Sequence, residues 1–238
     1  MTAFVLEPTW PGEVADLVDE PDAREVVASE PLALGRVWDV RRDTVALGDG
    51  QVVVRDYVVH TGAVAVLALD DAERVFLLRQ YRHPVAASLW EPVAGLLDVA
   101  DEHPWTGAAR ELVEEAGLRA GEWHTLVDFE NSPGGSSEAL RCYLARDLSP
   151  VPGGRPEGEG EERDLPFVWV PLDLAVEHVL AGRLTSPSTV LAVLAAAASR
   201  ASGWATLRPV DAPWPARAAV VAAGRARVYG PSSPRATD

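Results

Sequence analysis

The segment from Gly95 to Leu118, GLLDVADEHPWTGAARELVEEAGL, most limits what this chain can fold into. At about 100° per residue, an α-helix in its second half separates apolar from acidic side chains. The expected apolar face consists of Ala109, Leu112, Val113 and Ala116. The expected acidic face consists of Glu111, Glu114 and Glu115. Because like charges at i, i+4 destabilise a helix by about 0.2–0.5 kcal/mol per pair, this face predicts a bound cation such as Mg²⁺.

The ends of this helix carry ordinary signals. Thr106 is the expected N-cap after Pro104, and Gly117 stands where a left-handed residue ends a helix. Upstream, Gly95 allows a loop backbone to come close to a ligand or metal. The alternative interpretation of the acids is a solvated face in an acidic protein.

Over its whole length the segment resembles the Nudix box, whose family pattern is G-x5-E-x7-R-E-U-x-E-E-x-G-U, with U an aliphatic residue. The matching residues are Gly95, Glu102, Arg110, Glu111, Leu112, Glu114, Glu115, Gly117 and Leu118. A motif with this many fixed positions is specific. Six residues rather than five separate Gly95 from Glu102. Two arrangements therefore stay open: a one-residue bulge in the loop, or Asp101 in the acidic position.

The resemblance implies a fold, a reaction and a metal site. The fold is the Nudix α/β/α sandwich with a mixed β-sheet, and the reaction is hydrolysis of a nucleoside diphosphate linked to another group. The expected cofactor is Mg²⁺, with Mn²⁺ as the alternative, held by Glu111, Glu115 and the backbone carbonyl of Ala94. Such ions bridge the diphosphate and hold a water for attack on phosphorus. Arg110 is expected to orient Glu114 or its neighbour through a buried ion pair.

Three further features resemble the ADP-ribose pyrophosphatase branch of this family. Residues 80–83 (QYRH) and 89–95 (LWEPVAG) resemble its QYR…WELPAG approach, with Pro-Val in place of Leu-Pro. Pro133, fifteen residues after Leu118, stands where members that hydrolyse ADP-ribose tend to carry a proline. The third feature is a hairpin before the core, which in these relatives supplies strands exchanged between the two subunits of a dimer.

Phosphate binding in so acidic a chain requires local cations, because the formal net charge is −15. The candidates are Arg55 and Arg82, each on an expected strand and each with the planar guanidinium that suits phosphate oxygens. For both arginines the alternative is a surface arginine or an ion pair with Asp56 or Asp39. Trp38 is a candidate for stacking on an adenine, and a core or dimer-interface position is its alternative.

The catalytic base is expected in the acidic loop after residue 148. Related ADP-ribose pyrophosphatases place a catalytic glutamate in the corresponding loop, and counting back from Asp164 selects Glu161 over its neighbours. The neighbours are Glu157, Glu159 and Glu162. The alternative is that this Gly-Glu stretch is only a spacer.

The chain divides into four regions. Residues 1–28 mix prolines and acids and are expected to form a loosely ordered extension. Residues 29–60 contain strand patterns on both sides of the turn sequence 48–50 (GDG), which predicts an N-terminal β-hairpin region that mediates dimerisation. The Nudix hydrolase domain is expected over 61–207, followed by a peripheral C-terminal tail over 208–238.

Within the expected domain, strand and helix patterns alternate. Strands are predicted at 63–69, 75–82, 122–130, 139–145 and 167–170. The first two are expected to pair with each other, and residues 148–164 are expected to lack regular structure. Closing helices are predicted at 172–180 and after the N-cap pair Ser186-Pro187. This order by itself indicates an α+β fold or a three-layer α/β/α arrangement.

Composition excludes several classes of protein. The excess of acid argues against nucleic-acid partners and against adsorption to anionic membranes. Cys142 is the only cysteine, so an intrachain disulfide and a cysteine-based zinc site are excluded. The five histidines lack zinc-hydrolase spacing. The first residues do not form a secretory signal, so a cytoplasmic location is expected.

The sequence therefore predicts a Mg²⁺-dependent Nudix pyrophosphatase that cleaves ADP-ribose to AMP and ribose 5-phosphate as a homodimer. One alternative is a pyrophosphatase for other nucleoside diphosphate sugars or dinucleotides. Another is a non-catalytic Nudix-fold module that binds ADP-ribose and regulates another process. The intact acids Glu111, Glu114 and Glu115 favour the enzyme, because a pure sensor does not need a full set of metal ligands.

Overall fold

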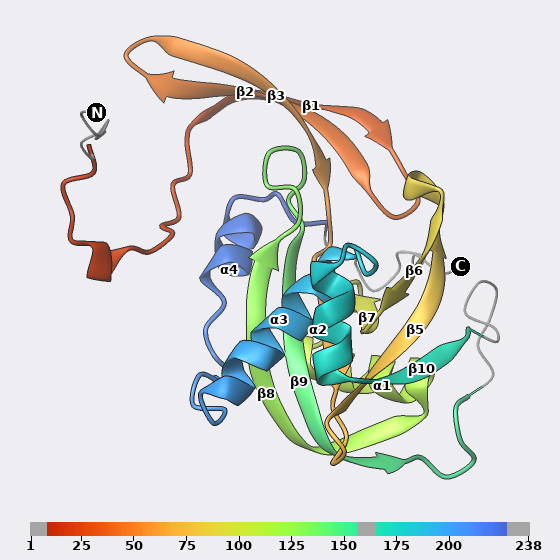
Figure 1. The fold of residues 1–238 in the computed structure, drawn as a ribbon. Helices are drawn as coiled ribbons and strands as arrows, with labels where there is room; N and C mark the ends of the chain where they lie inside the picture. The colour runs from red at the N-terminus through yellow and green to blue at the C-terminus, as the bar shows by residue number, and fades with distance from the viewer. Residues whose placement is uncertain (1–8, 157–164, 228–238) are drawn as a thin grey trace.

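Two sheets form the body of the structure, which is a computed structural model that describes residues 9–156 and 165–227 (Figure 1). The central sheet has the order β7-β4-β9-β8, with β4 and β9 parallel and the outer strands antiparallel to their neighbours. Its strands are β4 (Ala63–Ala68), β7 (Val93–Leu96), β8 (Leu118–Glu130) and β9 (Ala139–Pro150). The second sheet, β10-β5-β6, is antiparallel. It consists of β5 (Arg74–Arg82), β6 (Ala87–Glu91) and β10 (Phe167–Pro171).

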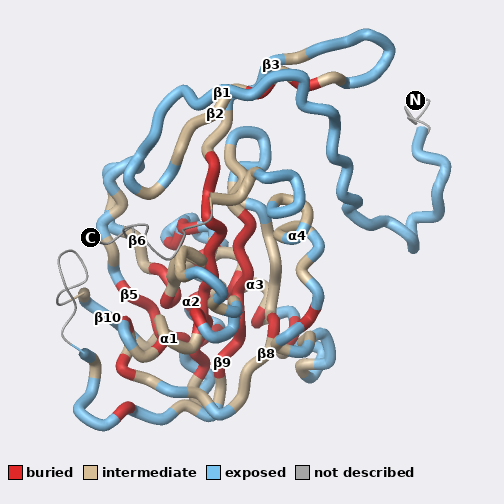
Figure 2. Tube along the Cα trace, turned by 180° about the vertical axis from the view of Figure 1, so that it is seen from behind, coloured by how far each residue is buried: buried red, intermediate tan, exposed pale blue. Residues whose placement is uncertain are grey.

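Helices cover both faces of the central sheet. Successive residues of β4 alternate between the faces: Val64 packs in the cluster that contains Leu112 of α1, and Ala65 packs in the cluster that contains Ala192 of α3. The helices are α1 (Pro104–Ala116), α2 (Leu172–Leu180), α3 (Pro187–Ala201) and α4 (Pro215–Ala222). Figure 2 shows that the buried residues concentrate in the central strands, whereas α4 contributes none. The predicted α/β/α sandwich with a mixed sheet is confirmed.

A separate three-stranded antiparallel sheet projects from one end of the body (Figure 1). Its strands are β1 (Val26–Leu34), β2 (Asp39–Gly48) and β3 (Gln51–Val59), and most of its surface is exposed (Figure 2). The predicted hairpin is present, because Gly48, Asp49 and Gly50 all have positive φ and turn β2 into β3. β1 begins at Val26, inside the range predicted for the N-terminal extension, which also contains the short 3-10 helix Val14–Asp16.

Two predictions about the strands were wrong. β4 and β5 do not pair as strands but lie in different sheets, joined by an isolated bridge between Leu69 and Val75. β6 and β7, which flank Pro92 and pair with β5 and β4, were not predicted at all. Their short lengths explain the omission, since five and four residues are too few to show a clear period. A 3-10 turn, His83–Val85, connects β5 to β6.

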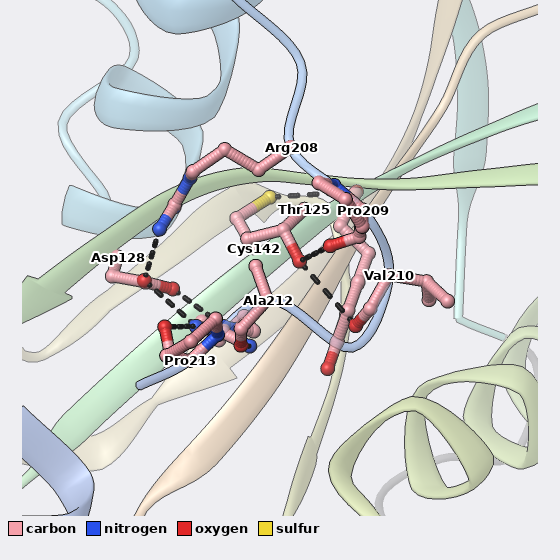
Figure 3. Close-up of polar contacts among 10 residues, drawn as sticks. Thr125, Asp128, Cys142, Arg208, Pro209, Val210, Ala212 and Pro213 are labelled. Atoms are coloured by element: carbon pink, nitrogen blue, oxygen red, sulfur yellow. Dashed lines mark hydrogen bonds and ion pairs between the residues drawn. The ribbon is translucent and has the colours of Figure 1, made fainter. Parts of the chain in front are cut away.

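Residues 208–213, the start of the segment predicted to be peripheral, are instead fixed to the central sheet (Figure 3). Thr125 of β8 donates its hydroxyl hydrogen to the carbonyl of Pro209, with an O–O distance of 2.9 Å. Asp128, also on β8, accepts from Nη1 of Arg208 at 2.9 Å. From β9, Arg141 donates to the backbone carbonyls of Ala212 and Pro213 at 2.7 and 3.0 Å. The prediction failed because backbone acceptors in a Pro- and Ala-rich segment leave no trace in its composition.

Among the described residues, no helix combines the length and hydropathy that a membrane span requires.

Candidate functional site

Helix α1 begins and ends close to the predicted residues. Its N-cap is His103 rather than Thr106, because Pro104 already occupies the first helical position and the His103 ring accepts from the backbone N–H of Trp105 at 3.3 Å. At the other end, Gly117 has φ +65° and caps the helix, as predicted. The acids therefore occupy the middle and the last turns of the helix.

The buried face of α1 is rotated by about one residue from the expected one. Ala108 and Leu112 are fully buried in the core beneath α1, whereas Ala109 and Val113 are only partly buried. Glu115 is on the packed side and is only 6% exposed, while Glu114 points outward. The predicted separation into an apolar face and an acidic face is thus incomplete, because one of the acids is buried.

The buried acids of α1 pack directly against the backbone of β7. Glu115 accepts a hydrogen bond from the N–H of Ala94 at 3.1 Å. Gly95 lies under the Glu111 carboxylate, and a Cβ at this glycine would be only 2.2 Å from Glu111 Oε1. Glycine is therefore required here for a close approach between backbone and carboxylate. The structure brings Glu111, Glu115 and Ala94 together, as the sequence predicted.

The Ala94 carbonyl lies on the same edge of β7 as these carboxylates. Ala94 is opposite Ala65 of β4, and its N–H is used by Glu115 rather than by the sheet. In an antiparallel pair the N–H and C=O groups of one residue point to the same side. The carbonyl oxygen of Ala94 therefore faces away from β4, toward the side where Glu115 approaches.

Arg110 connects the remaining acids of the motif. Its Nε and Nη2 donate to the two oxygens of Glu102, each at 3.1 Å, and its Nη1 donates to both Glu111 and Glu114 at 2.8 Å. These bonds raise the pKa of Arg110, with the Glu102 hydrogen bonds as the largest cause and burial opposing them. The predicted ion pair to Glu114 is present but exposed rather than buried, whereas the pairs to Glu102 and Glu111 are partly buried.

The same contacts decide between Asp101 and Glu102. Glu102 holds Arg110 with both oxygens, and its side chain is 12% exposed. Asp101 is exposed and has φ +61°, a left-handed conformation that absorbs the extra residue of the loop. The bulge arrangement is therefore the one that the structure adopts.

Arg82 lies at the end of β5 and binds Glu91, the last residue of β6. Its Nε and Nη2 both donate to Glu91 Oε2, at 2.9 and 2.6 Å. The other oxygen of this buried carboxylate accepts from the hydroxyl of Ser186 at 2.8 Å. A cavity of about 310 Å³ opens beside this part of β5. Its lining residues are Arg79, Gln80, Tyr81, Ser88, Leu165 and Pro166.

Arg55 lies on β3 of the projecting sheet, where it is exposed and donates to the carbonyl of Val54 at 3.0 Å. In the described part of the chain, the two acids expected as alternative partners of Arg55 are paired with other arginines. Asp56 binds Arg42, and Asp39 binds Arg227. The structure of a single chain therefore does not bring Arg55 together with α1.

Trp38 stands at the base of the projecting sheet, just before β2. Its ring is 45% exposed and stacks on His60, with ring centroids 5.7 Å apart. Burial lowers the pKa of His60 and thereby favours the neutral imidazole under Trp38. The nearby Glu138 carboxylate has the opposite and smaller effect on this pKa. One face of the indole is therefore already occupied.

The remaining candidate, Glu161, lies outside the described residues.

Comparison with known proteins identifies the family. The family model described as the NUDIX domain matches residues 59–188, just over half of the chain. The chain belongs to the NUDIX family. An ADP-ribose pyrophosphatase of Mycobacterium tuberculosis is 44% identical over 202 residues, which cover 85% of this chain and 96% of that protein.

Other relatives agree with this assignment to the NUDIX family. An ADP-ribose pyrophosphatase of Bacillus subtilis is 35% identical over 137 residues, covering 58% of this chain and 74% of that protein. A crystal structure of an ADP compounds hydrolase superposes with a TM-score of 0.65 at 23% identity, covering 78% of this chain and 99% of that chain. At this identity the structural match supports the Nudix fold alone.

The Nudix box of this chain has a donor set that suits a hard divalent cation. Three carboxylates, those of Glu102, Glu111 and Glu114, bind the single guanidinium of Arg110, and a fourth, that of Glu115, binds the N–H of Ala94. Across the described residues, no three acidic, histidine or cysteine side chains converge on one point. Two carboxylates with a backbone carbonyl are nevertheless a usual Mg²⁺ set, since this ion keeps several waters and takes substrate phosphates as ligands.

Two residues of this region, Glu91 and Ser186, are not predicted from the sequence to act at the site. The available signal for Glu91 was its place three residues before Ala94, in the segment 89–95 that resembles the WELPAG approach. Nothing in the local sequence links Glu91 to Ser186, because the two residues are 95 positions apart.

Proposed function

We propose that this NUDIX protein hydrolyses ADP-ribose to AMP and ribose 5-phosphate. The observation that carries the proposal is the placement of Glu111 and Glu115 against the Ala94–Gly95 backbone within an intact Nudix box. The similarity to ADP-ribose pyrophosphatases from two organisms supports ADP-ribose as the substrate. A pure binding module would not require this crowding of carboxylates, which has an energetic cost without a cation.

In this proposal Glu111, Glu115 and the Ala94 carbonyl hold Mg²⁺, or Mn²⁺ in its place. When bound, the cation supplies Lewis-acid stabilisation to the diphosphate and acidifies water. The chain itself fixes the geometry: Gly95 leaves room for the Glu111 carboxylate, and Nη1 of Arg110 donates to both Glu111 and Glu114. These restraints keep the acids close together before substrate arrives.

The diphosphate needs positive charge besides the metal, and Arg82 is the proposed source. Its side chain is 42% exposed and is held by Glu91 at the end of β6, three residues before Ala94. Glu161 is the proposed catalytic base, on the strength of the family resemblance of its loop. Arg55 is proposed to act on the substrate only from a partner subunit, since within one chain it lies on the projecting sheet.

The purified chain is expected to release AMP and ribose 5-phosphate from ADP-ribose in the presence of Mg²⁺. The rate should fall to background in EDTA and return when Mg²⁺ or Mn²⁺ is restored, because the carboxylates alone cannot neutralise the diphosphate. Chromatographic detection of AMP measures this directly. A panel containing ADP-glucose, GDP-mannose and NADH separates the alternatives. If one of these compounds is turned over faster than ADP-ribose, that compound is the preferred substrate. Tight binding of ADP-ribose without release of AMP would indicate a regulatory module.

The chain is further proposed to form a homodimer through its projecting sheet. Val52 and Val54 lie on one face of β3 and are each 54% exposed, which is costly for an isolated monomer. Light scattering is expected to give twice the mass of 25.5 kDa for the wild-type chain. The Val54→Asp variant should shift toward the monomer, because dimerisation would bury its charge. A Gln51→Asp variant at the exposed turn is the control, and a monomeric wild type would contradict the proposal.

A further inference from the structure

A line of hydrogen bonds joins the start of α3 to the guanidinium of Arg82. Ser186 donates its hydroxyl hydrogen to Glu91 Oε1 at 2.8 Å, and Glu91 Oε2 accepts from Arg82 Nε and Nη2 at 2.9 and 2.6 Å. The first two members are buried, with Ser186 2% and Glu91 7% exposed. The Arg82 side chain, at 42% exposed, is the member that faces solvent.

Ser186 occupies the N-cap position of α3 but does not cap the helix with its side chain. A serine at this position normally accepts a hydrogen bond from an N–H of the first helical turn. Here its hydroxyl is directed to Glu91 instead. Thr189, one turn later, donates to the carbonyl of Trp90 at 2.7 Å. The first turn of α3 therefore holds both of the last two residues of β6.

Glu91 is well placed to transmit this restraint. It is opposite Leu78 of β5 in the sheet, and it precedes Ala94 of β7 by three residues. A carboxylate fixed from both sides holds a guanidinium in one orientation, whereas an arginine without such a partner samples many rotamers. Glu91 engages Nε and Nη2 of Arg82, and among the described residues no hydrogen bond is formed by Nη1, which is therefore placed to bind another anion.

We propose that Ser186 and Glu91 are positioning residues that aim Arg82 at the diphosphate of the substrate. The proposal rests on the proposed function, in which Arg82 binds a phosphate oxygen. Neither residue touches the substrate: Ser186 fixes Glu91, and Glu91 fixes the guanidinium. A pre-oriented guanidinium loses less conformational freedom when it binds, so the effect is expected in substrate affinity.

A double-mutant cycle tests the proposal, with kcat and KM for ADP-ribose measured in four proteins: wild type, Ser186→Ala, Arg82→Ala and the double variant. Arg82→Ala should raise KM roughly 10- to 100-fold, the usual effect of a charged hydrogen-bond donor. Ser186→Ala should raise KM about 2- to 10-fold with kcat little changed. In the Arg82→Ala background, Ser186→Ala should raise KM no further, because its effect passes through Arg82.

Two variants, one at Ser188 and one at Ser186 itself, serve as matched controls. Ser188→Ala removes the neighbouring hydroxyl, 3.1 Å from the Ser186 oxygen, and should leave KM unchanged. Ser186→Thr keeps a hydroxyl and should restore most of the wild-type KM. An unchanged KM in Ser186→Ala, or an equal rise in both backgrounds, would overturn the proposal. If Ser186→Ala does not fold, Glu91→Gln enters the same cycle and is judged by the same criterion.

A binding measurement separates failure of this inference from failure of the proposed function. Calorimetry with a methylene-bridged analogue of ADP-ribose reports the same cycle without turnover. Coupling between Ser186 and Arg82 in analogue binding, together with no hydrolysis by the wild type, would reject the enzyme but retain the positioning roles. Hydrolysis by the wild type without that coupling would reject the positioning roles alone. Absence of both binding and hydrolysis rejects both.

Discussion

Replacing Glu111 or Glu115 by glutamine is expected to lower kcat by about 10²- to 10⁴-fold. A metal ion supplies several kcal/mol of charge stabilisation in phosphoryl chemistry, and each 1.36 kcal/mol is a factor of about ten in rate. Glutamine keeps the shape of the side chain and still offers Ala94 an acceptor, but it removes the charge that holds the cation. Steady-state kinetics and Mg²⁺ titration by calorimetry measure the two effects together.

The melting temperature distinguishes this loss from damage to the fold. Glu115 and Glu111 both pack against the Ala94–Gly95 backbone, so Glu115→Gln should leave Tm unchanged or raise it. Glu111→Gln also loses an ion pair with Arg110, so its Tm should fall by no more than a partly exposed pair contributes. Gly95→Ala provides an independent route to the same result, because its methyl group would displace the Glu111 carboxylate. Glu177→Gln, an exposed acid on α2 at the other face of the sheet, is the matched control. Near-normal activity and Mg²⁺ uptake in both site variants would remove these acids from the mechanism.

The helix of the Nudix box could be predicted because its information is local. The acids, Gly95 and Gly117 are all within one segment, and their spacing alone specifies which groups share a side of the helix. The error of about one residue in the buried face has a local cause as well. Gly107 and Ala108 are small and carry little hydrophobic signal, yet both are buried: Ala108 packs in the core beneath α1, and Gly107 lies against the Glu102 carboxylate.

The parts that could not be predicted depend on contacts between distant residues. β4 and β5 are both apolar segments, and the sequence of an apolar strand does not indicate which other strand it pairs with. The Ser186–Glu91 hydrogen bond and the attachment of residues 208–213 to β8 and β9 join positions that are 71 to 95 residues apart. Local periodicity cannot report such pairs, since each partner taken alone is an ordinary polar residue.

Replacing Arg141 by methionine is expected to destabilise the fold by about 3–5 kcal/mol, the usual cost of removing one partner from a buried ion pair. Arg141 is 3% exposed and binds both oxygens of Asp128, at 2.7 and 2.9 Å. Methionine would also leave the carbonyls of Ala212 and Pro213 without their donor. At about 2–4 °C per kcal/mol for a chain of this size, Tm should fall by roughly 6–20 °C in differential scanning calorimetry.

A second cross-strand Arg–Asp pair in the same chain provides the control. Arg42 and Asp56 face each other on β2 and β3 with two hydrogen bonds of 2.7 Å, the same geometry as Arg141 and Asp128, but on the exposed sheet. Arg42→Met should leave Tm nearly unchanged, because solvent already screens this pair. Equal Tm losses in the two variants would show that geometry rather than burial determines the contribution. A loss confined to Arg141→Met would show that burial, rather than geometry alone, determines how much an Arg–Asp pair contributes to the stability of this fold.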